Sequence, residues 1–301
     1  MADELSYDAI EVGKTYGPWK YPLADRIARY LEAIENEHPW HRERSPWGPA
    51  VAPPSVLGLA AMRFLDSVGP VPPGTLHAKQ EIETSAALRL DRQPAAYGKF
   101  IDKYEKRGRK YFVFEARFRD ETGLIIGHSR VTMVFPPEEA AEGSGSRAEQ
   151  KTPERKGELG PITRTLTQEK LTAYSEDSAN AERGQSIHVN PEVAKAVGFP
   201  TTVAQGLMAA DYMSELMTVA LGKEWYEYAG LSVAFVRPML CGDTITANGR
   251  VSEELEEGAV VRKVYELWTE NERGEPVALG RSHSLIMPGR ETAPSPRPTT
   301  G

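Results

Sequence analysis

The chain has 301 residues, 40% of them hydrophobic, and a formal net charge of −7 at pH 7. This length exceeds one ordinary domain, and the apolar content is enough to build two buried cores. Lys and Arg are dispersed without a basic run, which argues against nucleic-acid binding and against a helix lying on a membrane surface. No stretch approaches 18 apolar residues, and the acidic start lacks the apolar region of a signal peptide. We therefore expect a soluble, cytoplasmic protein.

In chain order, the first half begins with two helical patterns and continues with strands. Apolar residues at spacings of three and four predict helices over residues 26–41 and 55–69, joined by a loop that contains Ala52-Pro53-Pro54. Segments rich in β-branched and aromatic residues predict strands at 76–84, 95–105, 110–120 and 124–135. Residues 137–160 are polar, contain Gly and Ser and almost lack large apolar side chains, which is typical of a solvated linker.

The second half repeats this order of elements. A helical segment at 170–180 precedes a turn-rich loop, and an apolar helix follows within 201–222. Strands are then predicted at 231–240, 243–255, 260–271 and 276–287. An internal duplication is the economical explanation, with one long helix wrapped by an antiparallel sheet made twice. We place the first domain at 1–137, the linker at 138–158 and the second domain at 159–301.

The stretch from Tyr174 to Met217 carries the clearest chemical signal. It sets His188 at the end of the turn-rich loop, then a connection punctuated by Gly and Pro, then Gly206 at the start of the apolar helix, with Ser214 further along that helix. This order can place an imidazole base, a backbone N–H donor and a hydroxyl around one small cavity. Acyl-transfer and acyl-hydration chemistry need these parts.

The residues of this stretch resemble those of the MaoC-like, (R)-specific enoyl-CoA hydratase family, which has the hot dog fold. The resemblance covers nearly the whole chain, and the segments that carry it are Ile187-His188-Val189-Asn190-Pro191, Ala204-Gln205-Gly206-Leu207-Met208, Phe235-Val236-Arg237-Pro238 and Gly242-Asp243-Thr244. It implies an α+β double hot dog, two tandem hot dog domains that form a covalent version of the dimer made by single hot dog chains.

The resemblance also implies an enzyme that interconverts 2-enoyl-CoA and 3-hydroxyacyl-CoA. His188 matches the family's catalytic histidine, Gly206 the glycine whose N–H faces the thioester carbonyl, and Ser214 a serine that touches the active-site acid or water. Each also has a structural alternative. A loop histidine can simply pack the loop, a glycine can permit close packing at a helix start, and a helix serine can bond its own backbone.

The family's acid is missing at its usual position. Its motif D-x-N-P-x-H puts the acid five residues before the histidine, where this chain has Arg183. The loop is about three residues longer than the family's, so Asp177, Asn180 or Glu182 can take the place of the absent carboxylate. Asn180 is the match by order, but an amide orients water without exchanging a proton near neutral pH. Either a nearby carboxylate substitutes, or His188 works alone with ordered water.

The first half contains a second copy of the motif. Asn36-Glu37-His38-Pro39-Trp40-His41 has the family spacing, with His41 at the histidine position. Downstream, Val51-Ala52-Pro53-Pro54-Ser55 replaces the glycine segment, and Pro54 has no N–H to donate. We interpret the first half as a degenerate copy that shapes the acyl or CoA channel. The alternative is that His38 and His41 only satisfy a surface loop.

Other motifs are absent or incomplete. The sequence lacks G-x-G-x-x-G, a phosphate-binding P-loop and the G-x-S-x-G nucleophile elbow, and its histidines lack a third spaced ligand, so neither a cofactor nor a metal is expected. With Cys241 as the single cysteine, no intramolecular disulfide can form. The expected partner is an acyl-CoA or acyl-carrier-protein thioester, and a homodimer of double hot dogs is compatible with the sequence. The alternatives are a hot dog acyl-CoA thioesterase and a non-catalytic acyl-CoA-binding module.

Overall fold

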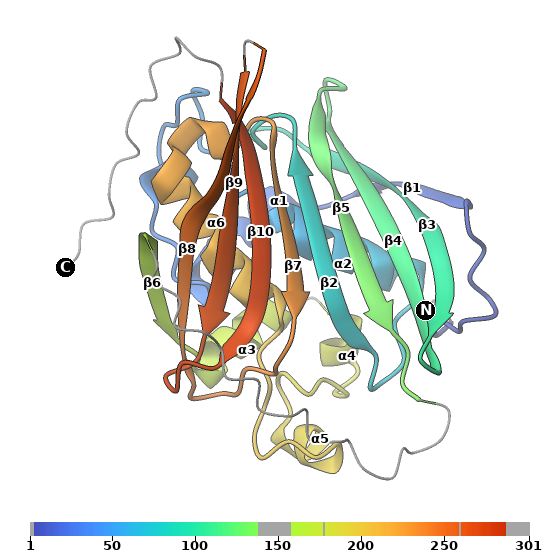
Figure 1. Ribbon diagram of the computed structural model, residues 1–301. Coiled ribbons are helices and arrows are strands. Elements are labelled where there is room, and N and C mark those ends of the chain that lie inside the picture. Colours follow the sequence, from blue (N-terminus) through green and yellow to red (C-terminus); the bar gives the residue numbers. More distant parts are fainter. Residues whose placement is uncertain (1–2, 138–157, 177, 259, 287–301) are drawn as a thin grey trace.

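The computed structural model describes residues 3–137, 158–176, 178–258 and 260–286, which form one antiparallel sheet with helices packed on one face (Figure 1). The first half supplies β1 (Thr15–Lys20), α1 (Leu23–Ala33), the 3-10 helix η1 (Pro39–His41), α2 (Val56–Val68), β2 (Leu76–Thr84), β3 (Pro94–Lys106), β4 (Arg109–Asp120) and β5 (Ile125–Val134). The second half supplies β6 (Leu159–Thr165), α3 (Gln168–Ser175), α4 (Ala179–Glu182), α5 (Pro191–Ala196), α6 (Leu207–Leu221), the 3-10 helix η2 (Gly222–Trp225), β7 (Ala229–Phe235), β8 (Thr244–Glu257), β9 (Val260–Glu270) and β10 (Pro276–Ile286).

The sheet has ten strands in the order β1-β3-β4-β5-β2-β7-β10-β9-β8-β6. Each half therefore repeats the same strand order outward from the centre. The halves join where β2 pairs antiparallel with β7, from Lys79 opposite Ala234 to Glu83 opposite Gly230. Each half wraps its strands around one long helix, so the fold is the expected α+β double hot dog. The internal symmetry agrees with a duplication.

The two central helices lie inside the core. All residues from Leu207 to Thr218 of α6 are buried, and nine residues of α2 are buried. A helix that is apolar on nearly all sides is stable only when other elements surround it. The helices meet near their starts, because a Cβ on Gly58 of α2 would come within 3.2 Å of the Leu207 side chain of α6. The beginning of both central helices thus lies at the junction between the halves.

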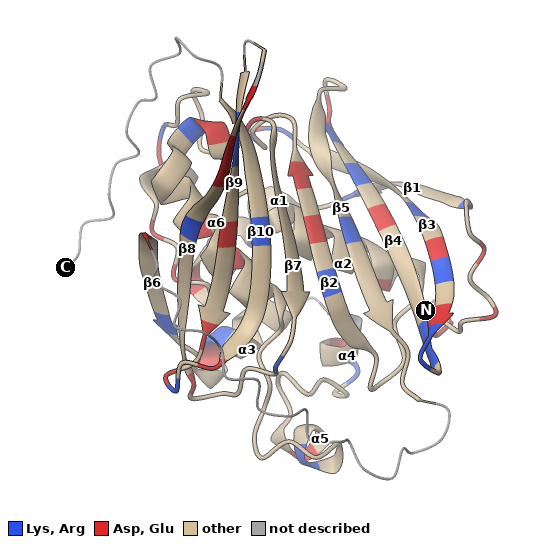
Figure 2. Cartoon of the chain, viewed as in Figure 1, with Lys and Arg blue, Asp and Glu red and all other residues tan. Residues whose placement is uncertain are grey.

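Charged residues of both signs lie on neighbouring strands of the sheet (Figure 2), and several form cross-strand pairs. Glu115 on β4 accepts from Arg130 on β5 at 2.8 Å, and Arg250 on β8 pairs with Glu266 on β9 at 2.6 Å. The alternation of charged and buried residues along these strands is typical of an antiparallel sheet with one solvated face. The functional chemistry therefore has to be sought on the helical side.

The predicted linker, residues 138–158, lies almost wholly outside the described residues. Two edge strands, β1 and β6, were not predicted from the sequence. Each contains a Gly-Pro pair, Gly17-Pro18 and Gly160-Pro161, at which its pairing with the neighbouring strand shifts register. Proline interrupts the strand pattern but is tolerated at a sheet edge, where one side needs no hydrogen-bond partner.

Two predicted helices were too long. The helix predicted over 26–41 ends at Ala33, because Glu35 has a φ of +52° and the chain turns before a separate 3-10 helix at Pro39. The helix predicted over 170–180 likewise ends at Ser175. In both halves the chain leaves the α-helix before it reaches the histidine, so His188 sits in a turn and His41 in the short 3-10 helix η1.

Candidate active site

His188 lies in a turn between α4 and α5, and its ring is fixed by a backbone carbonyl. Its Nδ1 is 2.6 Å from the carbonyl oxygen of Val203. A carbonyl can only accept, so this bond requires the proton on Nδ1 and leaves a lone pair on Nε2. The backbone N–H of His188 donates to the Ser186 hydroxyl at 3.1 Å. The ring is therefore oriented as a proton acceptor.

The charge state of His188 supports the same role. Burial lowers its pKa to about 4, the Val203 carbonyl opposes this shift, and the positive charge of Arg63 adds to it. Arg63 belongs to α2, the central helix of the first half, and its side chain is buried. At neutral pH the imidazole is uncharged, which is the form that can take a proton from water.

Gly206 directly precedes α6 and follows Val203 by three residues. Within the described part of the chain, no acceptor lies within hydrogen-bond distance of its backbone N–H. The first N–H groups of a helix have no partner inside the helix and form the positive end of the helix dipole. This amide is therefore available to an oxyanion. The contact between His188 and Val203 ties the imidazole to the chain segment three residues before this amide.

Glycine at position 206 also has a steric reason. A Cβ there would stand 3.0 Å from the ring of Phe235 at the end of β7. The Phe235 ring in turn packs against His77, with ring centroids 4.8 Å apart. Any larger residue at 206 would have to displace this ring.

Ser214 is fully buried in α6, and its hydroxyl has a different partner from the one predicted. The Oγ atom accepts from the Trp225 indole N–H at 3.0 Å. The Trp225 carbonyl accepts from Thr84 of the first half at 3.4 Å. Among the described residues, no contact joins Ser214 to His188. Its role at the His188 site stays a prediction.

The three candidates for the missing acid differ in how much the structure says about them. Asp177 lies outside the described residues. Asn180 lies in α4 with a partly buried side chain, and its carbonyl accepts from Gln185 at 2.9 Å. Glu182 lies in the same short helix and is exposed. Neither Asn180 nor Glu182 contacts His188 in the described part of the chain, so the acid stays a prediction.

Helix α3 holds both parts of the candidate site, which the sequence did not reveal. At its first residue, the Gln168 amide donates to the His188 carbonyl at 3.2 Å and accepts from the Thr202 hydroxyl at 2.5 Å. At its last residue, the Ser175 hydroxyl accepts from the Gln205 amide at 2.9 Å. A glutamine at a helix start gives no functional signal by itself.

Sequence reasoning also missed a buried carboxyl group on α6. The Oδ1 of Asp211 accepts from the Tyr30 hydroxyl at 2.7 Å, and its Oδ2 accepts from the Tyr174 hydroxyl at 2.6 Å. Burial raises the pKa of Asp211 to about 6, although the bonds from the two tyrosines oppose the shift. The signal for it was an acid inside an otherwise apolar helical pattern, AADYM.

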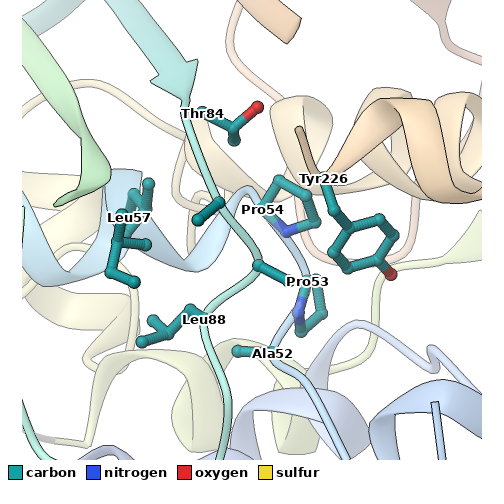
Figure 3. A pocket seen from close by; sticks show the side chains of 10 residues that line it. Ala52, Pro53, Pro54, Leu57, Thr84, Leu88 and Tyr226 are labelled. Atoms are coloured by element: carbon teal, nitrogen blue, oxygen red, sulfur yellow. The ribbon is translucent and has the colours of Figure 1, made fainter. Parts of the chain in front are cut away.

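The first half repeats the histidine contact, and Pro54 stands three residues after Val51 as Gly206 stands three residues after Val203. The Nδ1 of His41 is 2.8 Å from the carbonyl oxygen of Val51, as His188 is bonded to Val203. Burial lowers the pKa of His41 to about 3. The chain then enters α2 through Pro53 and Pro54, which have no N–H. Figure 3 shows both prolines lining a small hollow opposite the ring of Tyr226.

Aromatic side chains surround the ring of His41. Tyr226, which follows η2 in the second half, has its ring centroid 4.9 Å from that of Trp47, 5.8 Å from Trp40 and 6.3 Å from His41. The Trp47 indole donates to Glu227 at 2.7 Å. The first-half copy therefore combines a buried histidine with packed aromatic rings and two prolines before α2.

No group of three or more His, Cys, Asp or Glu side chains that could hold a metal ion occurs within the described ranges. The same ranges contain no helix that is long and apolar enough to cross a membrane.

The chain is similar to known proteins in sequence and in fold. Residues 150–271 match the family model described as MaoC like domain. The (R)-specific enoyl-CoA hydratase of Rhodospirillum rubrum is 24% identical over 98 residues, which cover 33% of this chain and 66% of that protein. The match thus spans slightly less than two thirds of the relative.

Several solved structures share the fold over nearly the whole chain. A MaoC-like dehydratase matches with a TM-score of 0.72 and 16% identity, covering 94% of this chain and 99% of that one. A MaoC-like dehydratase from Phytophthora capsici matches with a TM-score of 0.67 and 18% identity, covering 95% and 100%. A conserved hypothetical protein of Mycobacterium tuberculosis, described as a double hot dog, matches with a TM-score of 0.61 and 10% identity, covering 94% and 99%.

These comparisons and the strand order define a double hot dog protein. Most of its second half matches the MaoC-like domain model, and part of the chain is similar to an (R)-specific enoyl-CoA hydratase.

Proposed function

We propose that this protein is a hydratase that interconverts 2-enoyl and 3-hydroxyacyl thioesters. One observation carries the proposal: the neutral His188 ring is held by the carbonyl of Val203, three residues before the unpaired amide of Gly206 at the start of α6. A base and an oxyanion donor on adjoining segments are the two groups that this reaction requires.

In the hydration direction, His188 Nε2 takes a proton from water as the oxygen of that water bonds to C3 of the enoyl group. The C2=C3 electron pair moves toward the thioester, and negative charge develops on the carbonyl oxygen. The Gly206 N–H and the α6 dipole stabilise this charge. A proton then adds to C2, delivered by the imidazolium or by an acid from the loop. Dehydration follows the same steps in reverse.

The loop acid and the substrate are also part of this proposal. Asp177, Asn180 and Glu182 remain the candidates for the group that orients the water or delivers the proton. The carrier is CoA or an acyl carrier protein, and the printed name of the Rhodospirillum rubrum relative supports CoA. We infer that the first half lines the channel for the acyl group or CoA. The aromatic packing around His41 and the prolines before α2 support a non-catalytic role for that half.

Product analysis tests the reaction class. The purified chain is incubated with a series of 2-enoyl-CoA esters, and the products are separated by mass. A new 3-hydroxyacyl-CoA supports the hydratase. Release of free CoA thiol would instead support the hot dog thioesterase, and saturable binding without a product would support the acyl-CoA-binding module.

A further inference from the structure

Three helices and the start of a fourth meet at the carboxyl group of Asp211. Asp211 is 1% exposed and lies in α6. Tyr30 comes from α1 in the first half and Tyr174 from α3 in the second half, and each hydroxyl donates to a different oxygen of the carboxyl group. The Tyr30 oxygen also lies 3.0 Å from the hydroxyl of Ser55, the residue before α2. We call Tyr30, Asp211 and Tyr174 the clamp.

The clamp is a polar group in the buried interior of the molecule. Within the described residues, no Lys or Arg pairs with the Asp211 carboxyl group, which is stabilised by hydroxyl donors. The other titratable groups near the clamp are Tyr212 and Glu215 on α6, Arg63 of α2 beside Tyr174, and Tyr21 beside Tyr30. Glu215 is paired with Arg164 of β6 at 2.8 Å. A buried carboxyl group without a cation is unfavourable compared with apolar packing, so its presence calls for a role that an apolar side chain cannot supply.

The clamp acts on the helix that holds the candidate site. Tyr174 belongs to α3, whose first residue, Gln168, contacts the His188 carbonyl and Thr202, and whose last residue, Ser175, contacts Gln205. The Tyr174 carbonyl also accepts from Arg63 of the first half at 3.0 Å. The position of α3 therefore sets both the histidine turn and the segment that leads to Gly206.

We propose that Asp211 is a positioning residue of this site: by accepting from Tyr30 and Tyr174 it fixes α3 against the central helix α6 and against the first half. Helix α3 then keeps the His188 turn in register with the Gly206 amide. This inference rests on the proposed function for its effect on turnover, but the clamp itself can be tested without a substrate.

The clamp has a pH dependence that separates it from the histidine. Above a pH of about 6 the carboxyl group is ionised and accepts two charge-assisted hydrogen bonds. Below that pH it is protonated, and both bonds weaken. His188 stays neutral down to a pH of about 4. Loss of activity on acidification near pH 6 thus reports the clamp, whereas loss near pH 4 reports the histidine.

The test uses the full chain with Asp211→Asn, Tyr174→Phe and Tyr30→Phe. The matched control is Tyr212→Phe, because the Tyr212 hydroxyl is buried beside Asp211 and has no hydrogen-bond partner within the described residues. A second control, Glu215→Gln, removes the other α6 carboxyl group, whose pKa burial raises to about 7. Amide hydrogen exchange at Val203 is the substrate-free readout, because its N–H donates to the carbonyl of Ile187 in the histidine turn at 3.1 Å.

We expect the three clamp variants to lower kcat by about tenfold or more, since small displacements of reacting groups have large effects on rate. KM should change less than kcat. Exchange at Val203 should become faster, and Asp211→Asn should move the acidic limb of the pH–rate profile from near 6 toward 4. Tyr212→Phe should leave all readouts unchanged.

Unchanged exchange at Val203 in folded Tyr174→Phe and Tyr30→Phe would overturn the proposal, and so would an acidic limb that stays near 6 in Asp211→Asn. The proposal would also be overturned if the acidic limb of the pH–rate profile moved in Glu215→Gln but in none of the clamp variants. If Asp211→Asn fails to fold, amide exchange at Val203 in Tyr174→Phe and Tyr30→Phe tests the proposal instead. If the wild type does not hydrate enoyl thioesters, the proposed function fails, while the exchange measurement still tests the clamp.

Discussion

At the scale of single residues, the molecule contains two histidines with the same backbone contact and different surroundings. His188 adjoins a helix start with a free amide, and His41 adjoins two prolines and a set of aromatic rings. A motif in the sequence identifies both histidines, but only the neighbouring residues distinguish them. The spacing of the motif is better in the first half, yet Pro54, which has no N–H, stands at the position of Gly206 there.

Gly206→Ala tests the helix start. The added Cβ would lie 3.0 Å from the Phe235 ring, so the ring must move. Overpacking of this kind costs about 1–3 kcal/mol, and the moved ring would disturb the amide. We expect a folded variant with a reduced melting temperature and a kcat lowered by about a hundredfold. Because alanine keeps its backbone N–H, the double variant Gly206→Ala/Phe235→Leu should recover both stability and kcat. A kcat that stays low after stability is restored would contradict the explanation by a disturbed amide.

The loop acid is tested by Asp177→Asn, Asn180→Ala and Glu182→Gln, assayed with a 2-enoyl-CoA across pH. Because Glu182 is exposed, we expect Glu182→Gln to stay close to wild-type activity. One of the other two changes should reduce hydration strongly. A carboxylate at 177 would be shown by loss of activity in the amide variant, which keeps the shape but cannot ionise. Full activity in all three variants would replace the hydratase mechanism by the thioesterase or binding interpretation.

At the scale of elements, the regular parts of the fold follow from the sequence and the edges do not. The helices at 55–69 and within 201–222 and all eight inner strands were predicted, because long apolar or alternating patterns determine them. The edge strands β1 and β6 were not predicted, because a Gly-Pro pair interrupts the alternation of apolar and polar residues in each short strand. The site was predictable only where a motif marks it. His188 and Gly206 belong to such a motif, whereas the partners of Ser214 and Asp211 depend on how helices pack.

The clamp also makes a prediction for stability. Burial raises the pKa of Asp211 from 3.8 to about 6, so the folded state holds this proton more tightly than the unfolded chain. Its contribution to the free energy of unfolding is therefore fully present below pH 4 and is lost as pH rises through 6. This rise in the pKa corresponds to about 3 kcal/mol in the free energy of unfolding. Urea unfolding of wild type and Asp211→Asn is measured between pH 4 and 8. As the pH rises, the wild type should lose stability relative to the variant, because the variant has no carboxyl group to ionise at this position. A constant difference would contradict a raised pKa.

At the scale of the whole molecule, the two halves act as one body. Backbone hydrogen bonds between β2 and β7 join the sheets, and the clamp joins the helical layers. The second half alone would expose the edge of β7 and lose Tyr30. We expect residues 158–301, produced without the first half, to aggregate or to unfold at lower urea concentration. Co-production with residues 1–137 should recover soluble protein. A monomeric second half with wild-type stability would contradict this view.

The central claim is that the second half, through His188, carries the chemistry while the first half does not. The most direct measurement is the hydration rate of one 2-enoyl-CoA by wild type, His188→Ala and His41→Ala at pH 7.5. We predict that His188→Ala loses about two to four orders of magnitude in kcat with its fold retained, as expected for a removed general base. His41→Ala should lose stability, because the ring is 2% exposed, but keep most of its turnover. Wild-type turnover in a folded His188→Ala, or loss of activity confined to His41→Ala, would contradict the account.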